Sequence, residues 1–129
     1  MVRIFSIAPA VAVLALAPLL FSSAPVAAAA SQRLCGWVEN PTPGNWTLTD
    51  KSSTWIIGVQ GGHQAAGDLP DFQKGKAYWV KTQPNGYGYG CGCMDAVVDA
   101  STKEVSLIAN VRVKRLKVCR QDKALKVPK

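Results

Sequence analysis

The chain has 129 residues and a formal net charge of +7 at neutral pH, and 48% of its residues are hydrophobic. This length excludes a second sizeable domain beside an export signal, and the sequence holds no internal repeat. The charge is uneven, because residues 112–129 carry eight lysines and arginines against the single acid Asp122. The basicity therefore belongs to the C-terminal segment.

The first 30 residues have the pattern of a secretory signal peptide. Arg3 supplies a positive charge, an apolar run follows, and the alanines at 28–30 satisfy an A-x-A cleavage pattern. The apolar run is also about long enough for a membrane anchor, but the prolines within it and the alanine-rich exit favour cleavage. We therefore predict a signal peptide at residues 1–30. Residues 31–129 then form a single periplasmic or secreted domain with no integral membrane span.

All four cysteines lie in the expected mature chain, and the first of them, Cys35, is not placed to be a lipoprotein anchor. An even number of cysteines in a short exported chain is typical of disulfide bonds. The sequence therefore predicts two disulfides and an oxidising compartment.

Alternating β-branched and aromatic residues, separated by Gly, Pro, Asn and Asp, recur throughout residues 31–129, and no window of a dozen residues has helical periodicity. The pattern predicts an all-β domain, a small antiparallel sandwich or a partly open barrel of about six strands. The predicted strands are 34–38, 46–49, 54–60, 77–82, 86–98 and 104–119.

Polar turns predict two hairpins, one around residues 50–53 and one around 99–103. The segment NPTPGN, residues 40–45, is expected to be irregular, because proline lacks the N–H that a strand ladder requires. Residues 60–76 are assigned to no strand.

The stretch GYGYGCGC, residues 86–93, places a glycine at every second position of one predicted strand. Since side chains alternate between the faces of a strand, one face there would carry only glycines. Glycine weakens a strand, so this bare face requires a reason. Two reasons remain open. The first is internal packing, with an indole from another strand laid over the glycines, or curvature of the strand, and the second is an exposed ligand-accepting groove.

Cys91 and Cys93 are two residues apart on this strand, so an unstrained bond between them is disfavoured. Folding the last hairpin places Cys91 opposite Arg112 and brings Cys119 nearer to Cys91 than to Cys93, with a glycine-assisted bulge closing the gap. This favours Cys91 with Cys119 and Cys35 with Cys93, among three connectivities that the sequence leaves open.

The segments CGWVENPTPGNWTLTD, WIIGVQGGHQA and YWVKTQPNGYGYGCGC together closely resemble a family of small exported bacterial proteins, domain of unknown function 4087. The resemblance covers residues 34 to about 119. It implies a single exported, cysteine-containing domain and transfers no catalytic residue, because no activity is known for the family.

Aromatic rings near polar loop side chains are typical of glycan- or peptide-binding surfaces, where rings stack and amides fix orientation. Burial of at least two tryptophans in the core is the competing interpretation. The ligand-binding candidates are Trp37, Trp46, Trp55, Tyr87, Tyr89, Gln60, His63 and Gln64.

An enzyme is the second functional hypothesis. His63, the only histidine, is followed by Asp68 and Asp71 and could act as a general base in a small periplasmic hydrolase. Cys91 and Cys93 with His63 could instead bind a metal or carry thiol chemistry, but cysteines of an exported chain are expected to be oxidised. No residue is therefore assigned as catalytic or as a metal ligand, and no cofactor is expected.

The C-terminal segment offers a row of cations that could bind an anionic surface, or could simply protect an edge strand from aggregation. The candidates are Arg112, Lys114, Arg115, Lys117 and Arg120. The predicted function is a binding or interaction module at the cell envelope, with an envelope component or exported protein as partner. The compartment disfavours nucleic acid.

Overall fold

Short β-branched and aromatic segments form six strands in the computed structural model of the chain, which describes residues 21–24 and 29–129. Most of the predicted signal peptide lies outside these residues. The elements are β1 (Gln32–Thr42), β2 (Asn45–Thr49), β3 (Thr54–Gly58), β4 (Trp79–Lys81), the 3-10 turn η1 (Pro84–Gly86), β5 (Gly88–Asp99), β6 (Glu104–Lys114) and the helix α1 (Leu116–Gln121). The predicted all-β class with about six strands is confirmed.

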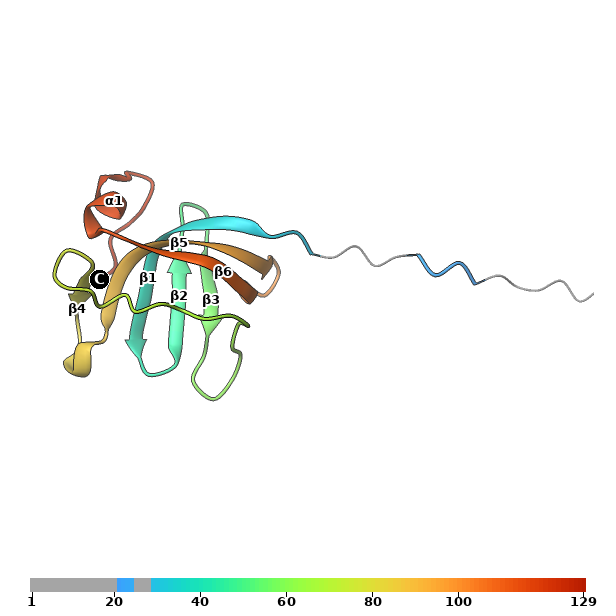
Figure 1. Cartoon of the computed structure of the whole chain (residues 1–129), viewed down its shortest axis with the longest axis horizontal. Helices are drawn as coiled ribbons and strands as arrows, with labels where there is room; N and C mark the ends of the chain where they lie inside the picture. Colours follow the sequence, from blue (N-terminus) through green and yellow to red (C-terminus); the bar gives the residue numbers. More distant parts are fainter. Residues whose placement is uncertain (1–20, 25–28) are drawn as a thin grey trace, which may run out of the picture.

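The strands form one curved sheet in the order β1-β2-β3-β6-β5-β4, and β1 also pairs with β5. Five strands therefore follow one another in a ring, with β4 beside the beginning of β5. Neighbouring strands are antiparallel except β3 and β6, which meet through the single parallel bridge between Ile56 and Glu104. Figure 1 shows β5 and β6 lying across β1 to β3, with α1 at the end of β6. This is a partly open barrel with mixed strand directions.

Both predicted hairpins are present. Asp50 accepts hydrogen bonds from the backbone N–H groups of Ser52 and Ser53 at 2.7 and 2.8 Å in the β2–β3 turn. Asp99 does the same for Ser101 at 2.8 Å in the β5–β6 turn. An aspartate before a turn often stabilises it in this way.

The NPTPGN segment is less irregular than expected, because β1 continues through Thr42, β2 begins at Asn45, and only Pro43 and Gly44 form the turn. A register shift between Glu39 and Thr42 lets Pro41 lie in β1 outside the regular ladder. The buried Asn40 side chain then donates to the carbonyl oxygens of Thr42 and Asn45, both at 2.8 Å.

The predicted last strand, 104–119, was also wrong for its last five residues. β6 ends at Lys114, and Leu116–Gln121 form the six-residue helix α1. Leu116 and Cys119 are three positions apart and are both buried, so they share the inner face of the helix. The glycine strand likewise starts two residues later than predicted, because Gly86 belongs to η1.

The bare glycine face of β5 is covered by the backbone of β4 at Gly88 and by aromatic rings at Gly90 and Gly92. A Cβ on Gly90 would lie 2.9 Å from the Trp79 indole, and one on Gly92 would lie 2.9 Å from the Phe72 ring. Trp79 and Phe72 belong to the main hydrophobic core. Internal packing is therefore the reason for the pattern within β5, with the indole over Gly90 and the Phe72 ring over Gly92.

A second, smaller cluster covers the outer face of β5. It consists of Trp37, Cys91, Leu116 and Cys119, with Val80, Tyr89 and Leu125 packed against it. The Cys91–Cys119 disulfide lies within this cluster and fixes α1 to the barrel. The second disulfide joins Cys35 to Cys93, which lie opposite each other on β1 and β5.

The favoured cysteine pairing is thus confirmed, but the register used to reach it was shifted. Cys91 lies opposite Lys114, and Arg112 lies opposite Cys93. Two bulges in the β5–β6 ladder, between Cys93 and Asp95 and between Val97 and Val98, bring the end of β6 closer to Cys91. The early end of β6 and the turn into α1 bring Cys119 the rest of the way.

Candidate functional site

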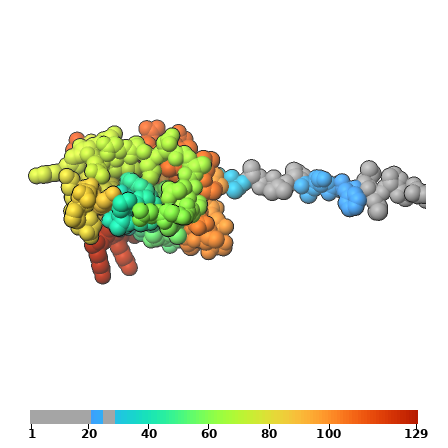
Figure 2. Space-filling model, turned by 90° about the horizontal axis from the view of Figure 1, so that it is seen from below, coloured from blue at the N-terminus to red at the C-terminus, as the bar shows by residue number. Residues whose placement is uncertain are grey.

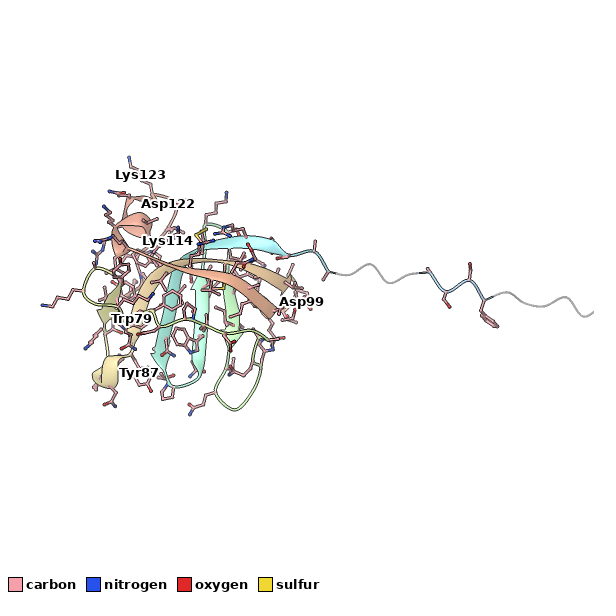
Figure 3. All side chains as sticks on the ribbon, in the orientation of Figure 1. Trp79, Tyr87, Asp99, Lys114, Asp122 and Lys123 are labelled. Carbon is pink, nitrogen blue, oxygen red and sulfur yellow. A yellow bond between two sulfur atoms is a disulfide. The ribbon has the colours of Figure 1, made fainter. Side chains whose placement is uncertain are left out.

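The cations of the C-terminal segment gather around the end of β6, α1 and the tail after it. We call this surface the basic end. It consists of Arg112, Lys114, Arg115, Lys117, Arg120, Lys123, Lys126 and Lys129, of which only Lys114 is half-buried and the others are exposed. Figure 3 shows Lys114, Asp122 and Lys123 at one end of the molecule and Asp99 at the other.

The short helix explains why these cations face outward. Its buried residues Leu116 and Cys119 anchor one face on the outer cluster, so Lys117, Val118 and Arg120 lie on the exposed face. Val118 is 47% exposed and lies between the two cations in the sequence. The outer face of α1 thus combines charge with an apolar side chain.

Few acids balance the basic end. In the described part of the chain the only ion pair joins Arg33 to Asp95 at 3.1 Å. The Asn110 side chain hydrogen-bonds to Asp95 and lowers its pKa, and Arg33 and Arg112 lower the pKa further. Arg115 lies 5.4 Å from the centre of the Tyr78 ring, a cation–π contact that leaves its charge in place. The basic end therefore keeps nearly all of its positive charge.

The tail after α1 returns to the β2–β3 turn. A hollow of about 250 Å³ there is lined by residues of the turn and by Ala124 and Lys126. Burial acts to raise the pKa of Asp50 in this turn, but hydrogen bonds from the Trp55 indole, Ser52 and Ser53 outweigh burial and lower it. Asp50 is therefore ionised at neutral pH and fixes the turn beside the tail.

The aromatic candidates separate into different environments. Trp37 is fully buried, with Tyr89 edge-on at 5.3 Å between ring centres. Trp55 is buried and its indole donates to Asp50 at 3.0 Å. Trp46 is half-buried against Phe72 and Trp79, with ring centres 6.2 and 6.3 Å away. Trp37 and Trp55 thus have core roles, and Trp46, Tyr87 and Tyr89 are half-buried.

The polar candidates lie in loops at the end of the barrel opposite α1, which Figure 2 views from below. The Gln60 backbone N–H donates to the Asn45 side chain at 2.9 Å, and the Gln64 amide donates to the Val59 carbonyl at 3.0 Å. The His63 ring nitrogen Nε2 lies 2.7 Å from the Val105 carbonyl, to which it donates. These contacts hold the loop against the barrel.

Metal binding and thiol chemistry were the alternatives considered for Cys91, Cys93 and His63. Cys91 and Cys93 are both in disulfides, and so are not thiolates in this form of the protein. Within residues 29–129 no group of three or more His, Cys, Asp or Glu side chains is arranged to hold a metal ion.

One further feature escaped the sequence reasoning, a hollow of about 400 Å³ between the turn at 73–76 and β4. Its walls are formed by Gln73, Gly75, Lys76, Trp79 and Lys81. Trp79 and Lys81 are two apart on a strand and therefore share a face, which is the only local signal for it. The rest of the lining lies just before β4 in the chain, where the N–H groups of Tyr78 and Trp79 donate to the Gly75 carbonyl.

No helix among the described residues has both the length and the hydropathy to cross a bilayer. Comparison with curated proteins and with solved structures yields no match. A family model described as "Protein of unknown function (DUF4087)" matches residues 29–126, which is nearly all of the described chain. The chain therefore belongs to this family of proteins of unknown function, as the sequence resemblance indicated.

Proposed function

We propose that the protein is exported by cleavage of residues 1–30 and acts in the periplasm or outside the cell as a binding module. Its basic end contacts an anionic surface of the envelope. The single observation that carries this proposal is the concentration of eight cations and one acid in residues 112–129, with all but one cation exposed. A cationic surface of this kind attracts anionic partners over a Debye length of about 8 Å at physiological salt.

The compartment is supported by the covalent framework. Two disulfides are typical of chains that fold outside the reducing cytoplasm. The predicted signal peptide points to the same compartment, where nucleic acid is a disfavoured partner.

Lipid headgroups are the anionic surface that the basic end suits best. Val118 and Val127 are 47% and 51% exposed, and each has lysine as its preceding neighbour. Cations beside exposed apolar side chains are typical of segments that lie at a membrane interface, where the charge binds headgroups and the apolar group enters the boundary. An anionic wall polymer would use the cations but not the valines.

The proposal is tested with the disulfide-bonded chain 31–129 and vesicles that contain phosphatidylglycerol, with phosphatidylcholine vesicles for comparison. Lys117→Gln and Arg120→Gln are made singly and together, since both side chains are exposed on α1. Lys103→Asn in the β5–β6 turn is the control, because it removes one charge at the opposite end and asparagine tolerates the positive φ of 63° there.

Each cation near an anionic membrane contributes about 1 kcal/mol, so each single variant at α1 should bind about fivefold more weakly and the pair about thirtyfold. Lys103→Asn should bind like the parent chain. Equal weakening by Lys103→Asn would contradict a local basic end, because it would indicate a dependence on net charge alone. Equal binding to both kinds of vesicle would contradict an anionic partner.

A further inference from the structure

The hollow between the turn at 73–76 and β4 combines two cations with an apolar wall. Lys76 and Lys81 both line it, Gln73 supplies a carboxamide, and Trp79 supplies the edge of an indole that is only 5% exposed. No carboxylate lines the hollow. Its volume of about 400 Å³ lies within the range of small-molecule sites.

The two lysines carry unbalanced charge. Neither makes an ion pair, since the described residues contain one only, between Arg33 and Asp95. The neighbouring acid Asp71 accepts a hydrogen bond from the Gln73 backbone N–H at 2.8 Å and does not line the hollow. Lysine ammonium groups act as point charges and accept either carboxylate or phosphate. The hollow therefore favours a ligand with one anionic group.

Hydrogen bonds fix the Trp79 wall and the backbone of the turn in place. The Trp79 indole N–H donates to the Gly86 carbonyl at 2.7 Å, and the Trp79 ring packs over Gly90 in the core. The Leu116 N–H donates to the Ala77 carbonyl at 2.8 Å, which ties the turn to α1. A rigid site loses less conformational entropy on binding than a mobile one.

Gly75 opens one side of the hollow. A Cβ at this position would meet no atom within 4 Å, so the backbone of the turn faces open space. An apolar indole edge beside a carboxamide suits the body of a sugar, whose C–H groups contact the edge and whose hydroxyls bond to the amide.

We propose that this hollow binds a monosaccharide that carries a carboxylate or a phosphate group. Lys76 and Lys81 bind the anionic group, and Gln73 and the edge of Trp79 contact the sugar ring. This site is separate from the basic end, which needs no hollow and no indole.

The test titrates ¹⁵N-labelled, disulfide-bonded chain 31–129 with glucuronate, glucose 6-phosphate, glucose and inorganic phosphate. The indole N–H resonance of Trp79 is the readout, because Trp79 lines the hollow and its N–H is held by the Gly86 carbonyl. Lys76→Gln with Lys81→Gln removes the two charges, and both side chains are exposed, so the fold should persist. Lys117→Gln with Arg120→Gln is the control with the same charge change.

We expect both charged sugars to shift the Trp79 resonance saturably, with the affinity reduced about tenfold for each lysine removed, because each charge-assisted hydrogen bond is strong. The control pair should bind the sugars as the parent chain does. An equal shift with glucose would overturn the role of the lysines, and an equal affinity for inorganic phosphate would overturn the role of the sugar ring. A failure here leaves vesicle binding intact, so the two proposals fail separately.

Discussion

The packing of the barrel can be tested by adding one methyl group to the glycine face of β5. In Gly92→Ala the new Cβ would lie 2.9 Å from Cε1 and 3.3 Å from Cζ of Phe72, and 3.1 Å from the Arg112 carbonyl oxygen. Phe72 is 1% exposed and lies within the aromatic cluster, so its ring has little room to move. The substitution therefore forces the core to repack around one methyl group.

The change in the free energy of unfolding caused by Gly92→Ala is the sum of two opposing contributions. Overpacking a well-filled core costs about 1–3 kcal/mol, and replacing glycine in a compatible backbone returns about 0.4–1 kcal/mol by restricting the unfolded chain. The net loss of about 1–2 kcal/mol should lower the melting temperature by about 5–15 °C, because 1 kcal/mol corresponds to about 4–8 °C in a domain of this size.

The assay is thermal unfolding of the disulfide-bonded chain followed by circular dichroism. Gly62→Ala is the matched control, because its Cβ would lie 3.8 Å from the Val59 side chain, an ordinary contact at an exposed position. Phe72→Leu in the Gly92→Ala background should destabilise less than the sum of the two single changes, because the leucine vacates the contested space. If the Gly92→Ala and Gly62→Ala variants had the same melting temperature, aromatic packing would not be the reason for the glycine face.

Two further predictions concern the covalent framework and pH. Brief treatment with dithiothreitol, followed by alkylation and peptide mapping, should label Cys35 and Cys93 first. The reason is that Cys35 is exposed, whereas Cys91 and Cys119 are only 1% and 2% exposed. Simultaneous labelling of all four cysteines would contradict this prediction. Hydrogen bonds hold the pKa of Asp50 below its ordinary value of 3.8, so its ionised form stabilises the fold above that pH and the stabilisation is lost as the pH falls through and below 3.8. Asp50→Asn should therefore lower the melting temperature at pH 7 and lose this effect near pH 2, and a difference independent of pH would show that ionisation is irrelevant.

Features that depend on local alternation could be predicted from the sequence. The two hairpins follow from turn residues such as Asp50 and Asp99, whose side chains bond to the next backbone N–H groups. The opposite directions of glycines and cysteines on β5 follow from the pleat. The favoured disulfide pairing followed from folding the last hairpin, which places Cys119 nearer to Cys91 than to Cys93. Even so, the register around Cys91 was displaced by two residues, because bulges between Cys93 and Asp95 and between Val97 and Val98 leave no clear trace in composition.

Features that depend on tertiary contacts could not be predicted from the sequence. Helix α1 has only six residues, too few for a periodic pattern, and is held by the burial of Leu116 and by the disulfide of Cys119. The hollow at β4 was missed for a different reason, because Gln73, Gly75 and Lys76 lie in the segment 60–76, which was assigned to no strand. Burial likewise decided between core and surface for Trp37 and Trp55, because composition does not distinguish a core tryptophan from an exposed one.

The most direct test of the proposed function maps which part of the protein touches the membrane. Phosphatidylglycerol vesicles that carry a spin-labelled lipid would be added to the ¹⁵N-labelled chain, and the broadening of each backbone amide resonance would be measured. The basic end predicts the strongest broadening over α1 (Leu116–Gln121) and the tail that follows it. Broadening centred on the β5–β6 turn at residues 100–103, at the opposite end of the molecule, would contradict the proposal.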